Sequence, residues 1–181
     1  MAFDTIYNKN GTIRGYAQTD NYERLGVHNL LHVEERKAAG VAAGTFTSGA
    51  YRTRQLSDVV LNAISGASLL SYQITLPAGD YFCIAYAPGY KVDGHCARLY
   101  DLTAAAVKVL GTMAYASASY GVESNSYLEG KFTLENETTL ELQHICYATM
   151  ADTGLGGGPA AVLAAAVSHC KYSDLKIWKV A

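Results

Sequence analysis

Three short stretches of the sequence place a histidine beside or close to a cysteine. They are "GHCARLYD" (His95 and Cys96), "QHICY" (His144 and Cys146) and "SHCKY" (His169 and Cys170). Histidine nitrogen and cysteine thiolate are favoured zinc ligands, and a thiolate activated by histidine is also a catalytic nucleophile. Because the chain has only 5 histidines and 4 cysteines, three such pairings raise both possibilities, with burial in a core as the alternative.

The spacing within the pairs disfavours a metal site. Neighbouring residues of a strand point to opposite faces, so His95 and Cys96 cannot hold one ion together in a regular strand, nor can the pair at 169–170. Only His144 and Cys146 share a face, and the tight C-x₂₋₄-C spacing of structural zinc sites is missing from the sequence. A site built across adjacent strands from Cys96, His144, Cys146 and one other residue stays as the alternative. The main prediction is no metal and no cofactor, with small buried thiols and with histidines at strand edges or an interface.

The sequence also disfavours catalysis. A catalytic thiol needs a polarised pocket, often at a helix N-terminus, and no helix is predicted beside any of the pairs. The glycine-rich "GLGGGP" (154–159) lacks the lysine and hydroxyl of a phosphate-binding loop. The carboxylate pairs Glu34–Glu35 and Glu135 with Glu137 are interpreted as solvated strand ends and turns. We therefore predict that the protein is not an enzyme.

Composition limits the partners. The net charge is -2 without a strongly basic stretch, which excludes the cationic surface that nucleic acid requires. Hydrophobic residues make up 50% of the chain and charged residues 17%, against roughly 25% charged in an average domain, so apolar surface is available for another subunit. The N-terminus does not read as a secretory signal, and "PAAVLAAAV" (159–167) is far shorter than the roughly 20 residues of a membrane span. We expect synthesis in the cytoplasm, free thiols and no membrane insertion.

The element pattern is that of an all-β protein. The chain has 14 tyrosines and 17 glycines but only 3 prolines, and short apolar stretches alternate with turn motifs. Asn10-Gly11 predicts a hairpin turn near the N-terminus, and 102–116 is the one helical candidate. Many short strands at this spacing predict a two-sheet antiparallel sandwich or a barrel. The predicted strands are 30–36, 45–53, 57–62, 69–76, 80–88, 95–102, 106–115, 125–134, 139–149, 160–168 and 173–180.

The strand at 80–88 differs from the others because both of its faces are apolar. A strand of this kind needs the opposing sheet on one face and another partner, plausibly a second copy of the chain, on the other. Smaller side chains suit the tight core between two sheets, so the larger ones are assigned to a subunit interface. The predicted core face carries Tyr81, Cys83, Ala85 and Ala87, and the predicted interface carries Phe82, Ile84 and Tyr86.

Several stretches resemble a phage-associated domain in sequence and order. They are "VEERKAAG", "GTFTSGAYRTRQLSD", "YQITLPAGDYFCIAYAPGYKVDGHCARLYD", "LEGKFTL", "LELQHIC" and "DLKIWKV". The resembling domain is found at the C-terminal end of tail fibres and other virion surface proteins, and looks like a member of the C1q/TNF-like jelly-roll group. The similarity covers Leu30 to Val180, roughly five-sixths of the chain, and contains no catalytic motif.

The resemblance implies an antiparallel jelly roll over residues 30–181, assembled as a homotrimer on a virus particle. Residues 1–29 are too short for a fibre shaft, so we expect an arm that docks onto another virion protein. The predicted function is a tail-fibre or spike tip that binds a glycan or protein receptor on the host surface. A capsid or tail decoration protein is the alternative. A polysaccharide-degrading enzyme is the third hypothesis, and it is disfavoured because no acid/base pair is evident.

Two segments are the candidate receptor-binding loops, "PGYKVDG" (88–94) and "SYGVESNS" (119–126). Each places a tyrosine beside polar groups, a combination that can stack on a sugar ring and bond its hydroxyls. Both are predicted to connect strands without a packing role. The candidate residues are Tyr90, Lys91, Asp93, Tyr120, Glu123 and Asn125.

Overall fold

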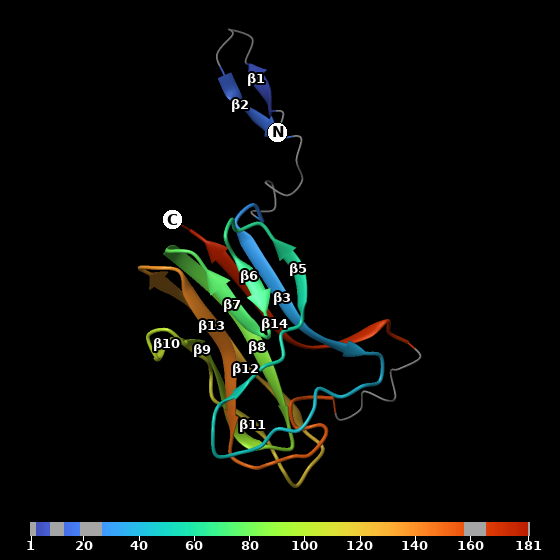
Figure 1. Cartoon of the computed structure of the whole chain (residues 1–181). Coiled ribbons are helices and arrows are strands. Elements are labelled where there is room, and N and C mark those ends of the chain that lie inside the picture. The colour runs from blue at the N-terminus through green and yellow to red at the C-terminus, as the bar shows by residue number, and fades with distance from the viewer. Residues whose placement is uncertain (1–2, 8–12, 19–26, 158–165, 181) are drawn as a thin grey trace.

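The computed structural model describes residues 3–7, 13–18, 27–157 and 166–180, and within these ranges it contains strands and turns but no helix (Figure 1). The all-β fold predicted from the sequence is confirmed. The strands are β1 (Phe3–Tyr7), β2 (Ile13–Gln18), β3 (Leu30–Ala38), β4 (Arg52–Thr53), β5 (Asp58–Asn62), β6 (Ser68–Leu70), β7 (Gln73–Leu76), β8 (Gly79–Tyr90), β9 (Asp93–Asp101), β10 (Ala106–Leu110), β11 (Ala114–Ala116), β12 (Glu123–Leu134), β13 (Thr138–Cys146) and β14 (His169–Lys179).

Two antiparallel sheets form a sandwich. One sheet has five strands in the order β12-β8-β14-β3-β5. The other has seven, with the path β10-β9-β13-β7-β6, to which β11 adds beside β9 and β4 beside β13. The strands β1 and β2 pair with each other as the predicted N-terminal hairpin, whose turn lies outside the described residues. Among the described residues there is no helix of the length and apolarity needed to cross a membrane.

Alternation along the strands explains why the sheets pack. On β8, Tyr81, Cys83 and Ala85 are at most 1% exposed and belong to the core between the sheets. On the facing sheet, Leu99 and Leu142 are fully buried in the same core. Because every second side chain is apolar and faces inward, burial of these side chains is the main force that holds the two sheets together.

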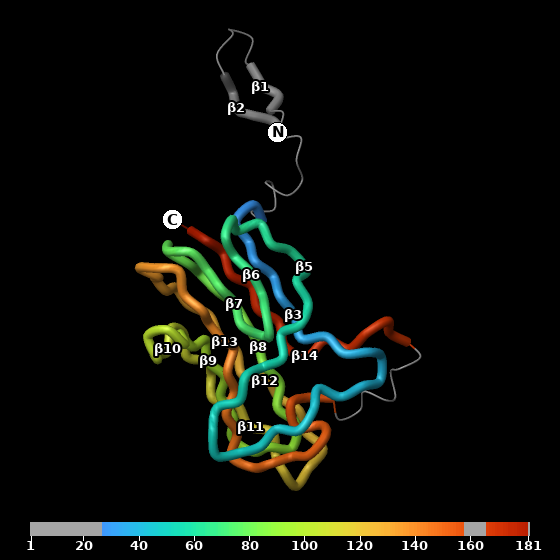
Figure 2. Tube along the Cα trace, in the orientation of Figure 1, coloured from blue at the N-terminus to red at the C-terminus, as the bar shows by residue number. Residues whose placement is uncertain are grey.

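The sandwich has two distinct ends (Figures 1 and 2). At one end, here called the terminal end, the chain enters β3 and leaves β14, and the Lys179 N–H donates to the Asn29 carbonyl at 2.9 Å. At the other, the loop end, lie the β8–β9 hairpin and the connection from β11 to β12. The Lys91 N–H donates to the Val122 carbonyl at 3.1 Å and joins these two connections.

Four predicted strands differ in the structure. Within the expected 45–53 strand, Arg52 and Thr53 form the short strand β4. Phe46 makes an isolated bridge to Met150, and the other residues of this segment are not strand. The expected 69–76 strand is the β6–β7 hairpin, with left-handed turn residues at 71–72. In the expected 160–168 strand, residues 166–168 are not strand and the rest lies outside the described residues.

The expected 106–115 strand is divided into β10 and β11, and the helical alternative at 102–116 is wrong. Gly111 lies at the division, and its N–H donates to the Ala97 carbonyl at 2.8 Å. A Cβ at this position would lie 2.7 Å from that same oxygen, so the close approach requires glycine.

Candidate functional site

His95 and His144 lie inside the sandwich and contact each other. Their side chains are 1% and 0% exposed, and His95 Nδ1 lies 2.9 Å from His144 Nε2. The expectation of histidines at strand edges or an interface is therefore wrong for this pair. Cys96 points to the opposite face of β9, where its thiol donates to the Gly111 carbonyl at 3.3 Å. The cross-strand metal site that would combine Cys96 with His144 and Cys146 is not assembled.

Three of the four cysteines are buried thiols. All four are free, and Cys83, Cys96 and Cys146 are buried. Burial raises the pKa of Cys83 to about 12 and that of Cys146 to about 11, and it also raises the pKa of Cys96. These three thiols are therefore protonated at neutral pH, the opposite of what a nucleophilic or metal-binding cysteine requires.

Beside the two histidines lies a buried ion pair. Arg54 and Glu35 have fully buried side chains, with Arg54 Nη2 at 2.7 Å from Glu35 Oε2. The Arg54 guanidinium also donates to the carbonyls of Pro88 and Leu155, at 3.2 and 2.8 Å. We call His95, His144, Arg54 and Glu35 the interior layer.

The interpretation of Glu34 and Glu35 as solvated is wrong. Glu34 is 5% exposed and Glu35 0%, whereas Glu135 and Glu137 are exposed as expected. Both buried carboxylates have cationic partners, because a buried charge without one would be very costly.

The five-stranded sheet turns its other side away from the core, and we call this side the open face. Cross-strand pairing sets its residues in rows, so that Ile84 lies between Glu129 of β12 and Lys176 of β14. Ile84 keeps 42% of its surface exposed. Aromatic rings flank it, with Phe82 and Trp178 at 6.3 Å and Tyr86 and Tyr127 at 6.4 Å between centroids. The residues predicted to form an interface, Phe82, Ile84 and Tyr86, all lie on this face.

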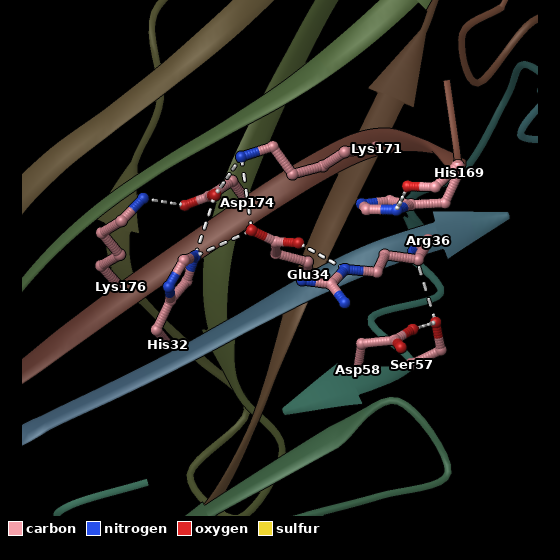
Figure 3. Close-up of polar contacts among 10 residues, drawn as sticks. His32, Glu34, Arg36, Ser57, Asp58, His169, Lys171, Asp174 and Lys176 are labelled. Atoms are coloured by element: carbon pink, nitrogen blue, oxygen red, sulfur yellow. Dashed lines mark hydrogen bonds and ion pairs between the residues drawn. The ribbon is translucent and has the colours of Figure 1, made fainter. Parts of the chain in front are cut away.

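A cluster of charges lies on the same face, where Asp174 pairs with Tyr86 across the strands. Figure 3 shows its members. Asp174 accepts hydrogen bonds from Lys176 at 2.5 Å, from Lys171 at 2.9 Å and from His32 at 3.0 Å. Glu34 lies within 3.3 Å of both Lys171 and His32. These residues and Arg36, whose Nε donates to Glu34 at 2.7 Å, are called the face cluster.

The electrostatics of the face cluster favour an ionised Asp174. Burial opposes the charge, but the hydrogen bonds from Lys176, Lys171 and His32 outweigh burial and lower the pKa of Asp174 to about 2. One ligand atom each from His32, Glu34 and Asp174 lies within 4.8 Å of the others, a geometry that could hold a metal ion. The Lys171 ammonium contacts both carboxylates at 2.9 and 3.3 Å, so a lysine already supplies the cation at this point.

Most of the first candidate loop belongs to strands β8 and β9 and packs against the rest of the protein. β8 extends to Tyr90 and β9 begins at Asp93, so only Lys91 and Val92 form the turn. Val92 is fully buried, and Asp93 Oδ1 accepts from the Ala118 N–H at 2.8 Å. The expectation that this segment lacks a packing role is therefore wrong, although Tyr90, Lys91 and Asp93 stay partly exposed.

The second candidate loop lies directly beside the first. Tyr90 and Glu123 are paired across β8 and β12, and Tyr120 is 73% exposed. Glu123 accepts from the Gly157 N–H at 2.8 Å, while the Asn125 amide donates to the Tyr127 hydroxyl at 3.4 Å. All six candidate receptor-binding residues thus lie at or next to the loop end. Glu123 and Asn125 also line a hollow of about 420 Å³ that reaches the open face.

The face cluster is the feature that sequence reasoning missed. Its signal was alternation of charge on one strand face, with His32, Glu34 and Arg36 two residues apart in "HVEER". The same spacing relates Asp174 and Lys176 in "DLKIW". Their mutual contact depends on β3 and β14 being neighbours, which the spacing within each strand does not reveal.

Known structures share this architecture. No family model matches the chain, and a search of curated proteins finds no match. Murine APRIL at pH 5.0 aligns with a TM-score of 0.53 and 11% identity, over 83% of this chain and 98% of that chain. The globular domain of zebrafish complement 1qA protein aligns with a TM-score of 0.52 and 13% identity, over 84% of this chain and 97% of that chain.

The fold is a C1q/TNF-like jelly roll. The antiparallel jelly roll predicted from the sequence is therefore confirmed. A third structure, the PRD1 vertex protein P5, aligns with a TM-score of 0.47 and 13% identity, over 84% of this chain and 96% of that chain. At such identities the jelly-roll similarity establishes architecture and leaves function to be argued from the surface.

Proposed function

We propose that this protein is a non-enzymatic surface component of a bacteriophage virion, a homotrimeric tail-fibre or spike tip that binds a glycan or protein on the host surface. Residues 1–29 dock it onto another virion protein. The sequence resemblance supports the virion role, and the jelly-roll fold is compatible with it. The observation that carries the proposal is the open face.

The open face has the character of a subunit interface. It combines an exposed Ile84 with the rings of Phe82 and Trp178, and aromatic side chains of this kind dominate interface cores. The neighbouring sheet edge is apolar as well, with Leu110 63%, Met113 78% and Tyr115 64% exposed. Apolar surface on a face and on an adjacent edge fits a head-to-tail contact, in which the edge of one copy covers the face of the next and the ring closes.

A hollow at the junction of face and edge supports such a contact. It measures about 400 Å³ and is lined in part by Ile84, Leu110 and Tyr127. A second hollow of about 660 Å³ continues from Leu110 to Met113 and Tyr115. Side chains of a neighbouring copy can enter both hollows and remove this apolar surface from water.

Light scattering of the purified chain tests the assembly. Wild type should have the mass of a trimer, and Ile84→Glu should give monomers or insoluble protein because it buries a charge in the contact. Leu70→Glu is the matched control, since Leu70 is 76% exposed on the β6–β7 hairpin and should leave the trimer intact. A monomeric wild type, or a trimer that survives Ile84→Glu, would contradict the proposed interface.

Binding to whole host cells tests receptor recognition by the loop end. Tyr90→Ala and Tyr120→Ala should each keep the trimer and weaken binding, because their rings offer stacking surface beside polar groups. Tyr72→Ala is the control, since Tyr72 is 41% exposed in the β6–β7 turn outside the loop end. Unchanged binding by both variants, or no binding by wild type, would favour the decoration role instead.

A further inference from the structure

The interior layer contains two histidines whose hydrogen-bond partners are all neutral groups. His95 Nε2 lies 2.8 Å from Ser124 Oγ, and its Nδ1 lies 2.9 Å from His144 Nε2. His144 Nδ1 is buried without a hydrogen-bond partner, and the ring packs 4.6 Å from Phe46 between centroids. No carboxylate forms a hydrogen bond with either ring among the described residues.

These contacts select one arrangement of protons. If His144 Nε2–H donates to His95 Nδ1, then His95 Nε2–H donates to Ser124, and the unpaired His144 Nδ1 is a bare acceptor. In the reverse arrangement His144 Nδ1 would carry a buried N–H without an acceptor, which costs more than a buried bare nitrogen without a donor. Charging His95 would place a second proton between the rings and break their hydrogen bond, and charging His144 would bury an unpaired N–H.

The surrounding charges also oppose a histidinium. Arg54 faces both rings, and its charge is balanced by Glu35 alone within the layer. One added proton would therefore leave the layer with a net positive charge away from water, at high cost. Other titratable groups near the layer include Arg52, Glu123, Cys146, Cys170 and Tyr172.

We propose that the interior layer is a proton switch, in which charging of His95 or His144 loosens the loop end while the terminal end stays folded. When the loop end holds a receptor, acidification then releases it. This last step rests on the proposed function, whereas the loosening does not.

The contacts of the layer explain why the loop end responds. Ser124, the partner of His95, is the second residue of β12, directly after the exposed Tyr120 turn. Gly89 at the end of β8 packs so closely that a Cβ there would lie 3.0 Å from the His95 ring. Arg54 holds the Pro88 and Leu155 carbonyls. Displacing the rings thus disturbs the Ser124 and Gly89 segments directly, and a histidinium repels the Arg54 charge that holds the Pro88 and Leu155 segments.

The terminal end is built differently. Its core is apolar, with Leu76, Leu134 and Ile177 at most 2% exposed, and these side chains do not titrate. The only tryptophan, Trp178, lies there on β14 and reports on this end by its fluorescence. A proton-driven change is expected to reach the loop end first.

The pH range follows from the histidines. Burial and the charge of Arg54 lower the pKa of His95 to about 4, and burial lowers the pKa of His144 well below its ordinary value. Because a depressed histidine pKa favours the folded state only while the ring is neutral, the contribution is complete above pH 6.5 and is lost toward about pH 4. From His95 alone, opening of the loop end should become roughly 50-fold more favourable between pH 7 and pH 4.5.

Two measurements on the full chain test the switch. Ring NMR titration should find two histidines that stay neutral to well below pH 6. Hydrogen exchange, corrected for the intrinsic pH dependence, should accelerate roughly 50-fold at 88–94 and 117–124 between pH 7 and pH 4.5. Over the same range, exchange at 74–76 and 132–134 and the Trp178 fluorescence should hardly change. Rings that titrate near pH 6.5, or equal acceleration at both ends, would overturn the proposal.

Variants then assign the effect to the rings. The double variant His95→Gln/His144→Gln keeps amide groups near the hydrogen-bonding positions but cannot titrate, so its loop-end exchange should lose the acid response. His169→Gln, the same change at an exposed histidine, should keep the response. If the double variant fails to fold, the titration and the hydrogen exchange of the wild type still test whether the switch exists. Neither readout needs a trimer or a receptor, so failure of the proposed function leaves this test intact.

Discussion

Glu34 and Glu35 are adjacent in the chain and yet belong to two unlike charged clusters. Glu35 points into the sandwich, where it faces the fully buried Arg54. Glu34 points to the open face, where Arg36, Lys171 and His32 surround it. Strand alternation separates the two carboxylates, and the difference in their cations decides how each cluster responds to acid.

The interior layer has one cation for one anion, so an added proton would give it an unbalanced buried charge. The face cluster has three permanent cations, Arg36, Lys171 and Lys176, for the two anions Glu34 and Asp174. Its lysines reach water, with side chains 38% and 36% exposed, so it can rearrange when one charge is lost. The comparison shows that a fully buried pair of one cation and one anion is more sensitive to a change of charge than a cluster with excess cations whose lysines reach water.

Breaking the interior pair should have the largest effect. Arg54→Met leaves Glu35 charged and buried without a partner, and removes the donors for the Pro88 and Leu155 carbonyls. We expect a loss of about 3–5 kcal/mol in the free energy of unfolding, measured by urea denaturation at pH 7 and fixed protein concentration.

The control for this change lies two residues away. Arg52 is exposed, and its side chain donates to the Thr47 carbonyl instead of to a buried partner, so Arg52→Met should cost less than about 0.5 kcal/mol. Adding Glu35→Leu to Arg54→Met should recover part of the loss, because no unpaired charge is left behind. Equal losses for the two arginine variants would show that the buried pair has no special role.

A charge removed from the face cluster should cost less. Asp174→Asn keeps the size of the side chain but leaves Lys171, Lys176 and His32 without their common acceptor charge. We expect a loss of about 1–3 kcal/mol at pH 7 by urea denaturation. Asp80→Asn, at an exposed carboxylate that accepts from Thr133, is the control and should be near neutral.

The pH dependence of this loss separates the two clusters. Because the pKa of Asp174 is lowered from 3.8 to about 2, its contribution is complete above pH 3.8 and is lost only toward pH 2. The cost of Asp174→Asn should thus not fall between pH 7 and pH 5, where the interior layer is already weakening. A cost that already falls between pH 7 and pH 5 would show that the clusters do not titrate separately.

The smallest effect is expected for one lysine of the face cluster. Lys171→Met removes an ammonium that contacts Asp174 and Glu34, but Lys176 and Arg36 remain. We expect about 0.5–1 kcal/mol at low salt, with less at about 1 M salt. Lys37→Met, whose ammonium contacts the neutral Gln55, should show no such salt dependence. A loss that is independent of salt would indicate packing rather than charge.

Period-two alternation is what the sequence could predict. It correctly separated Tyr81 and Cys83, which lie in the core, from Ile84, which lies on the open face. The predicted sandwich follows from the same alternation and from the turn residues between strands. Each of these inferences needs only residues that are close together in the chain.

Alternation along a single strand could not predict the contacts between strands that are distant in the sequence. His95 and His144 are 49 residues apart and meet only because β9 and β13 pair. Arg54 follows a segment predicted as a long strand, and its backbone instead crosses to Leu142, to whose carbonyl its N–H donates at 2.8 Å. An isolated arginine or histidine does not show whether it will be buried, because its burial depends on partners supplied by other strands.

The neighbouring positions of Asn29 and Lys179 have a practical consequence for engineering. Because the backbone enters and leaves the jelly roll at the terminal end, a fusion on either side extends away from the β8–β9 hairpin. New peptide sequences could be grafted into the exposed turn around Tyr120 while a carrier holds the opposite end. The two points at which the backbone enters and leaves the jelly roll are thus separated from the exposed Tyr120 turn by the length of the strands.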